Sequence, residues 1–215
     1  MLVIQKMLVD YNFSVRNGSI KYICIHDVGA TSTALANRNY FNSGKVGASA
    51  DFFIDSKNII QIIDYIKNYS WSVGDGKSKY GIANNNSVSI EMCLEPSLKP
   101  STATVTNTIN LVQKLMKDLN IPLERVVRHY DASHKSCPHS FSDNNWALWH
   151  EFKKQLISIP AVKIDNSKVL LLQKVCNRVG IRGANGKPLI EDGLDGINTA
   201  SAKERLIKYI AEVTK

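Results

Sequence analysis

Two histidines and a cysteine are the residues of this chain best suited to chemistry. His26 ends a mostly apolar run, His129 follows the short run 126–128, and Cys137 lies in the polar stretch that comes next. Two imidazoles and a thiolate are three good Zn²⁺ ligands, and three protein ligands with an open fourth position are typical of a catalytic zinc site. His139 and His150 are interpreted as ordinary surface residues.

A carboxylate and an ammonium group accompany these ligands. Glu91 lies inside the apolar run 87–94, where a carboxylate is costly without a partner. If this run is a strand beside the one that carries His26, Glu91 stands near the metal and can act as general base for a water. Lys135, two residues before Cys137, can stabilise an oxyanion. The alternatives are a salt-bridged glutamate on a solvent face and an ordinary loop lysine.

Strands that alternate with helices must position these groups. Segments with strand patterns cover residues 20–26, 50–54, 59–63, 87–94 and 124–128, and helical patterns cover 31–41, 101–119 and 146–156. The turn between 54 and 59 predicts a hairpin. Segments 66–86 and 129–144 are polar and are predicted to be loops. The alternation indicates an α/β domain over residues 1–157.

The rest of the chain predicts a linker and a small all-α domain. Residues 158–168 have linker composition, and residues 169–215 carry two amphipathic helical patterns. The first pattern ends at Gly180, and Thr199 is predicted to cap the second helix. Residues 159–215 hold 10 Lys and Arg against 6 Asp and Glu, which suggests an anionic partner such as a cell-wall polymer.

Composition excludes several classes of protein. The chain has 215 residues, 44% of them hydrophobic and 21% charged, as in soluble globular proteins. No apolar run approaches the roughly 20 residues of a membrane span, and the N-terminus does not resemble a secretory signal. The four cysteines form no C-x-x-C pair, so we expect synthesis in a reducing compartment. The scattered basic residues argue against nucleic-acid binding.

Five segments of the chain resemble the motifs of a known protein family. The run Val-Val-Arg-His-Tyr-Asp-Ala-Ser-His-Lys-Ser-Cys-Pro at 126–138 resembles the zinc-ligand loop of type 2 N-acetylmuramoyl-L-alanine amidases, the family of phage lysozyme-amidases and peptidoglycan recognition proteins. Residues 23–26, 48–55, 69–76 and 86–93 resemble the other family blocks, in the family's order. The resemblance covers about residues 18–157. It implies a central mixed β-sheet flanked by helices.

The resemblance also implies roles for single residues. The zinc ligands are expected to be His26, His129 and Cys137, with Glu91 and Lys135 as catalytic residues. Trp71 is expected to bind the substrate. Three positions depart from the family pattern: Asp51 replaces a common histidine, Ala50 a tyrosine that some members use, and Ser72 a histidine.

The C-terminal segment resembles another wall-associated domain. Residues 172–180 and 192–199 are similar to the small three-helix peptidoglycan-binding domain, with Asp195 where an aromatic residue is usual. Residues 169–215 are therefore predicted to bind the cell wall. The alternative is a stabilising helical appendage.

The function implied by the resemblance is zinc-dependent hydrolysis of the amide between N-acetylmuramic acid and L-alanine in bacterial peptidoglycan. A bacteriophage endolysin fits best, made in the host cytoplasm without a signal peptide and acting on the wall after release, with antimicrobial action. The alternatives are a non-catalytic peptidoglycan-binding protein of the same fold, a host autolysin, and a cysteine hydrolase that uses Cys137 with His129.

Overall fold

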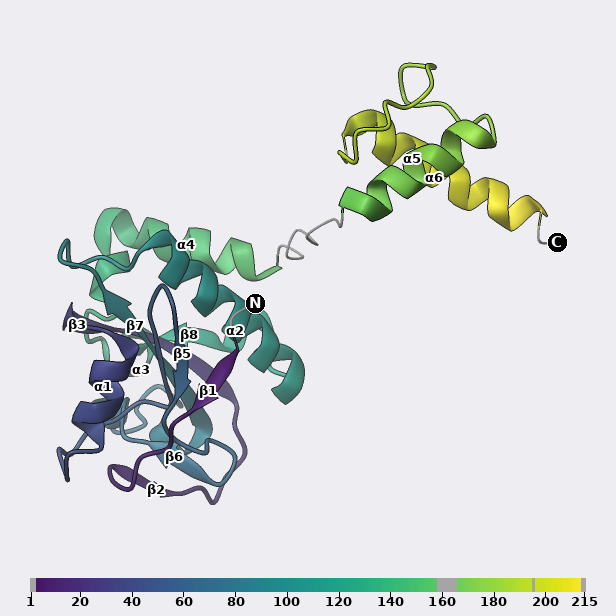
Figure 1. Cartoon of the computed structure of the whole chain (residues 1–215). Coiled ribbons are helices and arrows are strands. Elements are labelled where there is room, and N and C mark those ends of the chain that lie inside the picture. Colours follow the sequence, from purple (N-terminus) through teal and green to yellow (C-terminus); the bar gives the residue numbers. More distant parts are fainter. Residues whose placement is uncertain (1–2, 158–165, 195, 214–215) are drawn as a thin grey trace. The chain divides into compact units, whose positions relative to one another are not determined.

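The computed structural model describes residues 3–157, 166–194 and 196–213. The chain divides into two compact units, residues 1–158 and 159–215 (Figure 1). Most of the linker predicted at 158–168, together with Asp195, lies outside the described residues. Within the described parts, no helix is long and apolar enough to cross a membrane.

A six-stranded mixed sheet forms the centre of the first unit. The strands run in the order β1-β5-β4-β7-β3-β8, and only the hairpin pair β4–β5 is antiparallel. This confirms the predicted fold class and hairpin. The bounds are Ile4–Lys6 for β1, Ile59–Gln61 for β5, Phe52–Ile54 for β4, Ser87–Leu94 for β7, Tyr22–Thr31 for β3 and Val126–Arg128 for β8.

The two faces of the sheet have different covers. Helices α2 (Thr102–Leu119) and α4 (Asp143–Ile157) pack on one face, with the largest apolar cluster of the unit between them and the strands. The other face carries α1 (Ala34–Phe41) and, over β3 and β8, the short helix α3 (His129–Ser133). Because side chains alternate along a strand, His26 of β3 and Ser89 and Glu91 of β7 point to this second face.

Side-chain hydrogen bonds to backbone amides explain where helices α2 and α1 begin. Ser101 accepts a hydrogen bond from the Thr104 amide at the start of α2, and Thr33 accepts one from Ala36 at the start of α1. The predicted helix at 31–41 therefore begins later, because residues up to Thr31 continue β3.

Both segments predicted to be loops contain regular structure. Segment 66–86 holds β6 (Asn68–Ser70), which pairs antiparallel with β2 (Phe13–Val15), and two 3₁₀ turns, η1 (Gly74–Gly76) and η2 (Asn84–Asn86). Segment 129–144 holds α3, the turn η4 (His139–Phe141) and the first residues of α4. At 124–128 only the last three residues form a strand, after a 3₁₀ turn, η3 (Leu123–Arg125).

The second unit contains helices α5 (Asn166–Arg178) and α6 (Ile197–Val213). Cys176, Ala202 and Leu206 form its apolar core with Leu189. The prediction that Thr199 caps the second helix is wrong. Thr199 lies inside α6, buried, and accepts a hydrogen bond from the Gln173 amide.

A buried aspartate joins three strands of the first unit. One carboxylate oxygen of Asp51 accepts hydrogen bonds from the Ser89 amide of β7, at 2.7 Å, and from the Ser70 hydroxyl of β6, at 2.8 Å. The other oxygen has no partner among the described residues. Burial raises the pKa of Asp51 to about 6, against the two hydrogen bonds and the nearby Arg16 guanidinium. Asp51 thus takes a structural place just before β4.

We expect this carboxyl to make the fold less stable as the pH rises. Between its ordinary pKa of 3.8 and about 6, the folded protein binds more protons than the unfolded chain. The stability that the folded protein gains from the protonated Asp51 carboxyl is therefore full below about pH 4 and is lost as the pH rises through 6. The free energy of unfolding falls by about 3 kcal/mol over this range. Asp51→Asn keeps an acceptor oxygen but does not titrate. Its free energy of unfolding, relative to the parent protein, should rise by about 3 kcal/mol from pH 4 to pH 7 in urea denaturation.

Asp10→Asn, at an exposed position, is the matched control and should leave the pH profile unchanged. Parallel profiles for Asp51→Asn and the parent protein would contradict the prediction.

Candidate metal centre and active site

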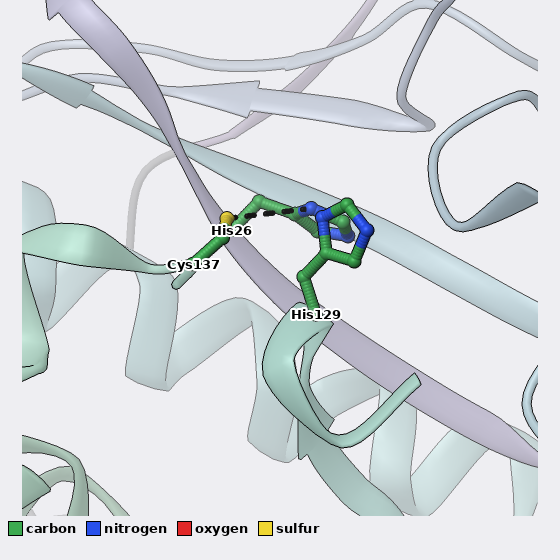
Figure 2. Close-up of side chains that lie close together, drawn as sticks. All are labelled: His26, His129 and Cys137. Carbon is green, nitrogen blue, oxygen red and sulfur yellow. Dashed lines mark hydrogen bonds between the residues drawn. The ribbon is translucent and has the colours of Figure 1, made fainter. Parts of the chain in front are cut away.

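Parallel pairing of β3 with its two neighbours places the site. His26 on β3 lies directly opposite Glu91 on β7, and Ile25 lies opposite Arg128, the last residue of β8. His129 follows as the first residue of α3, beside His26. The chain then returns through the loop after α3, which brings Cys137 to the same place (Figure 2).

The three predicted ligands converge. One donor atom from each of His26, His129 and Cys137 lies within 4.8 Å of the others, and all three residues are buried. The imidazole centroids are 4.7 Å apart, and the Cys137 Sγ lies 3.8 Å from the His26 Nδ1. Donor atoms bound to one zinc ion are separated by about 3.5 Å at ordinary bond lengths. The side chains therefore enclose a space of the size that one ion fills.

The donor set also fits a metal chemically. The His26 Nε2 is buried without a partner among the described residues, a costly arrangement unless something else binds the ring. Burial, helped by His129 and Lys135, lowers the pKa of His26 well below its ordinary value. Burial also lowers the pKa of His129, despite an opposing effect of Asp75. Both imidazoles are thus neutral at pH 7, the form in which they bind metals.

The same surroundings argue against a cysteine hydrolase. Burial and the Glu91 carboxylate raise the pKa of the Cys137 thiol, whereas a nucleophilic cysteine needs a lowered pKa. The Cys137 Sγ lies 3.8 Å from the Nδ1 of His26, not of His129, which is the partner that this alternative predicts. The thiol therefore lacks the activation that this chemistry requires.

Glu91 occupies the place expected from its strand. Its Oε1 lies 3.8 Å from the His26 Nδ1, and its Oε2 is buried without a partner among the described residues. Burial, with a smaller effect of Asp27 and against an opposing effect of Lys135, raises the pKa of Glu91 to about 8. A carboxyl group with a pKa near neutrality is suited to moving protons at pH 7.

All six predicted site residues line one cavity of about 300 Å³. Lys135 and Trp71 lie on its wall, together with the three ligands and Glu91. Trp71 is held by two hydrogen bonds, from its indole Nε1 to the Ser14 hydroxyl at 3.0 Å and from its amide to the Ser49 hydroxyl at 2.9 Å. His139, interpreted from sequence as a surface residue, is exposed and also lines this cavity.

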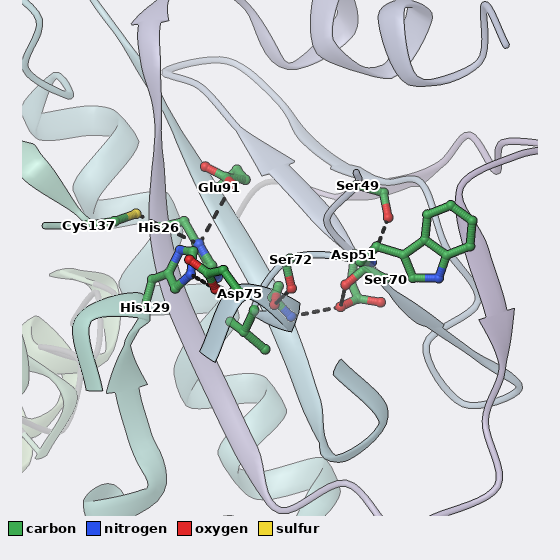
Figure 3. Close-up of polar contacts among 12 residues, drawn as sticks. His26, Ser49, Asp51, Ser70, Ser72, Asp75, Glu91, His129 and Cys137 are labelled. Atoms are coloured by element: carbon green, nitrogen blue, oxygen red, sulfur yellow. Dashed lines mark hydrogen bonds and ion pairs between the residues drawn. The ribbon is translucent and has the colours of Figure 1, made fainter. Parts of the chain in front are cut away.

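Sequence reasoning missed one carboxylate that touches the ligands. The Asp75 Oδ1 lies 2.8 Å from the His129 Nε2 (Figure 3), and its other oxygen accepts a hydrogen bond from the Ser133 hydroxyl at 3.1 Å. Asp75 belongs to segment 69–76, one of the blocks that carry the family resemblance. The place of Asp75 in this block was the one feature of the sequence that could have predicted a role for it in the site. Nothing in the local periodicity links position 75 to position 129.

Comparison with known families gives one match that spans more than half of the chain. A family described as N-acetylmuramoyl-L-alanine amidase matches residues 16–140. This segment includes all six predicted site residues, and it ends within the first structural unit.

Named relatives carry the same description. The N-acetylmuramoyl-L-alanine amidase CwlA of a Bacillus species is 28% identical over 196 residues, which cover 87% of this chain and 75% of that protein. XlyB of Bacillus subtilis is 31% identical over 60% of this chain and 40% of its own length. CwlL of Bacillus licheniformis is 27% identical over 96% of this chain and 59% of its own. The chain thus spans only about half the length of the latter two proteins.

Solved structures share the architecture of the first unit. PlyL superimposes with a TM-score of 0.62 at 27% identity, over 72% of this chain and 97% of that one. The PlyG catalytic domain superimposes with a TM-score of 0.63 at 29% identity, over 72% of this chain and 93% of that one. A mutant endolysin from Bacillus subtilis superimposes with a TM-score of 0.61 at 28% identity, over 73% of this chain and 99% of that one.

Proposed function

Because the chain belongs to the N-acetylmuramoyl-L-alanine amidase family, a family of enzymes, we propose that it hydrolyses bacterial peptidoglycan with zinc as its cofactor. The bond cleaved is the amide between the lactyl group of N-acetylmuramic acid and L-alanine. The observation that carries this proposal is the convergence of His26, His129 and Cys137 in the cavity that also holds Glu91 and Lys135. A catalytic metal needs this combination of three ligands with acid–base groups beside an open space.

Each residue has a definite task in this proposal. Zinc, held by the two histidines and Cys137, supplies Lewis-acid chemistry when it is bound. Glu91 accepts a proton from the attacking water and returns it to the nitrogen of the leaving L-alanine. The Lys135 ammonium group stabilises the negative charge that develops on the amide oxygen. Trp71 forms a rigid wall against which the glycan–peptide lies.

The test is an analysis of digested cell walls. Purified walls treated with the protein should release new amino groups that belong to N-terminal alanine. New reducing sugar ends instead would identify a glycosidase and contradict the proposal. Binding to walls without release of either group would favour the non-catalytic peptidoglycan-binding alternative.

Removal of a ligand should remove the metal. We expect about one zinc per chain by elemental analysis, and Cys137→Ser or His129→Ala should lose most of it. Because the site joins β3 to the segment after β8, chelation should also lower the midpoint of thermal unfolding. Cys93→Ser is the matched control, since Cys93 is buried on β7 outside the ligand set. Near-full zinc in both ligand variants would show that the ligand set is wrong.

Glu91→Gln should separate catalysis from metal binding. The amide is nearly the same size but cannot accept the proton, so we expect full zinc content and a rate of amino-group release lowered about 10²–10⁴-fold. Glu95→Gln, one residue beyond the end of β7 and exposed, should keep the parent rate. If Glu91→Gln keeps more than a tenth of the parent rate, Glu91 is structural.

We further propose that the protein is a bacteriophage endolysin, made in the host cytoplasm and acting on the wall after release. Its likeness to the Bacillus subtilis endolysin structure supports this role. A host autolysin is the alternative.

In the same proposal, residues 1–157 are the catalytic domain, 158–168 a linker and 169–215 a wall-binding domain. The separate compact unit at 159–215 and its excess of basic residues support this organisation. An anionic wall polymer is a second candidate ligand for that domain.

Removal of the second unit should affect intact walls most. A chain ending at residue 158 should keep its zinc and cleave soluble muropeptides at the parent rate, because every proposed ligand lies before that point. On intact walls it should be slower, since the second contact is lost. Segment 159–215 alone should sediment with walls, and in about 0.5 M salt, where surface charges are screened, only binding by a shaped site should persist. No sedimentation at low salt would contradict the wall-binding assignment.

A further inference from the structure

Asp75 is a polar group in the site to which the proposed reaction gives no task. Its carboxylate meets His129 at 2.8 Å, through the Nε2 ring nitrogen. A neutral imidazole has one N–H and one lone pair, so a nitrogen that faces a carboxylate this closely must carry the hydrogen. The lone pair then belongs to Nδ1, which is the only nitrogen of that ring left to bind a metal.

The turn η1, which carries Asp75, packs closely against α3. A Cβ at Gly76 would lie 2.1 Å from the Ala132 carbonyl oxygen, so only glycine permits this contact. On the other side, the Asn84 side-chain oxygen accepts hydrogen bonds from the amides of Ser72 and Val73, at 3.0 and 2.7 Å. These contacts fix the turn η1 against the helix that begins with His129.

A surface ion pair does not account for this arrangement. The Asp75 side chain is 47% exposed, and an ion pair at such a position contributes little to folding stability. His129, in contrast, is 3% exposed. The geometry therefore serves the ring orientation of His129 more than the stability of the fold.

We propose that Asp75 is a positioning residue that fixes the tautomer and orientation of His129 for metal binding. The inference rests on the proposed function only in taking His129 as a metal ligand. Carboxylates in such positions raise the basicity of the ligand and hold its ring, and their loss typically weakens metal affinity 10–100-fold. At His26 the Glu91 Oε1 lies 3.8 Å from Nδ1, beyond hydrogen-bond distance, and Nε2 lacks a partner among the described residues. Control of orientation is thus assigned to one of the two histidines.

The first measurement is zinc affinity, determined by competition with a chelator. Asp75→Ala should raise the dissociation constant 10–100-fold, and Asp75→Asn, which keeps the shape but not the charge, should raise it less. Ser133→Ala is the matched control, because it removes the other hydrogen bond to the same carboxylate without touching His129. It should bind zinc within twofold of the parent protein.

The second measurement reports the tautomer directly, in the zinc-free protein. Long-range ¹H–¹⁵N NMR of the His129 ring should show the hydrogen on Nε2 in the parent protein and in Ser133→Ala. In Asp75→Ala the two tautomers should be mixed. An unchanged tautomer, or zinc affinities of both Asp75 variants within twofold of the parent, would overturn the inference.

The two measurements also separate this inference from the proposed function. A parent protein that binds no zinc would contradict the zinc amidase, whereas the NMR result would still decide what Asp75 does to His129. Should Asp75→Ala fail to fold, Asp75→Asn provides the zinc-affinity comparison, with the smaller expected effect.

Discussion

The register between β3 and β7 is the constraint on which the rest of the site depends. Because His26 pairs with Glu91 in a parallel ladder, both side chains leave the sheet on the same face and at the same height. A slip of one residue would turn every side chain of one strand to the opposite face. The apolar residues fix the register, since Ile23, Ile25 and Ile90 must all lie under α2 and α4. Burial of apolar side chains on one face thus aligns the polar ones on the other.

Much of this could be predicted from sequence, because strand patterns are local. Alternation in 87–94 placed Glu91 on a definite face, and the ligand residues stood out by their chemistry. The missed elements depend on distant partners or are very short. Strand β6 has three residues and exists through pairing with β2, over fifty residues earlier, and the five-residue α3 is too short for a periodic pattern.

Asp75 shows why residues that hold the metal ligands in place are harder to predict from sequence than the ligands themselves. Its role follows from the close packing of Gly76 on Ala132, a contact between segments that are far apart in the chain. A glycine in a polar segment indicates a turn as readily as a close approach. The polar residue Asp51 illustrates the same difficulty, because its hydrogen bonds to Ser89 and Ser70 form only once three strands have assembled.

The different covers of the two sheet faces have a consequence for protein engineering. Strand β7 presents Val88, Ile90 and Met92 to the helices and presents Ser89, Glu91 and Cys93 to the opposite face. Substitutions that improve packing under α2 and α4 therefore replace no residue of the cavity wall on that strand, and their effects on stability and on rate should add where the substituted site lies more than about 10 Å from the cavity. Thermal tolerance and substrate preference can be selected in separate libraries, one for each face, and combined afterwards.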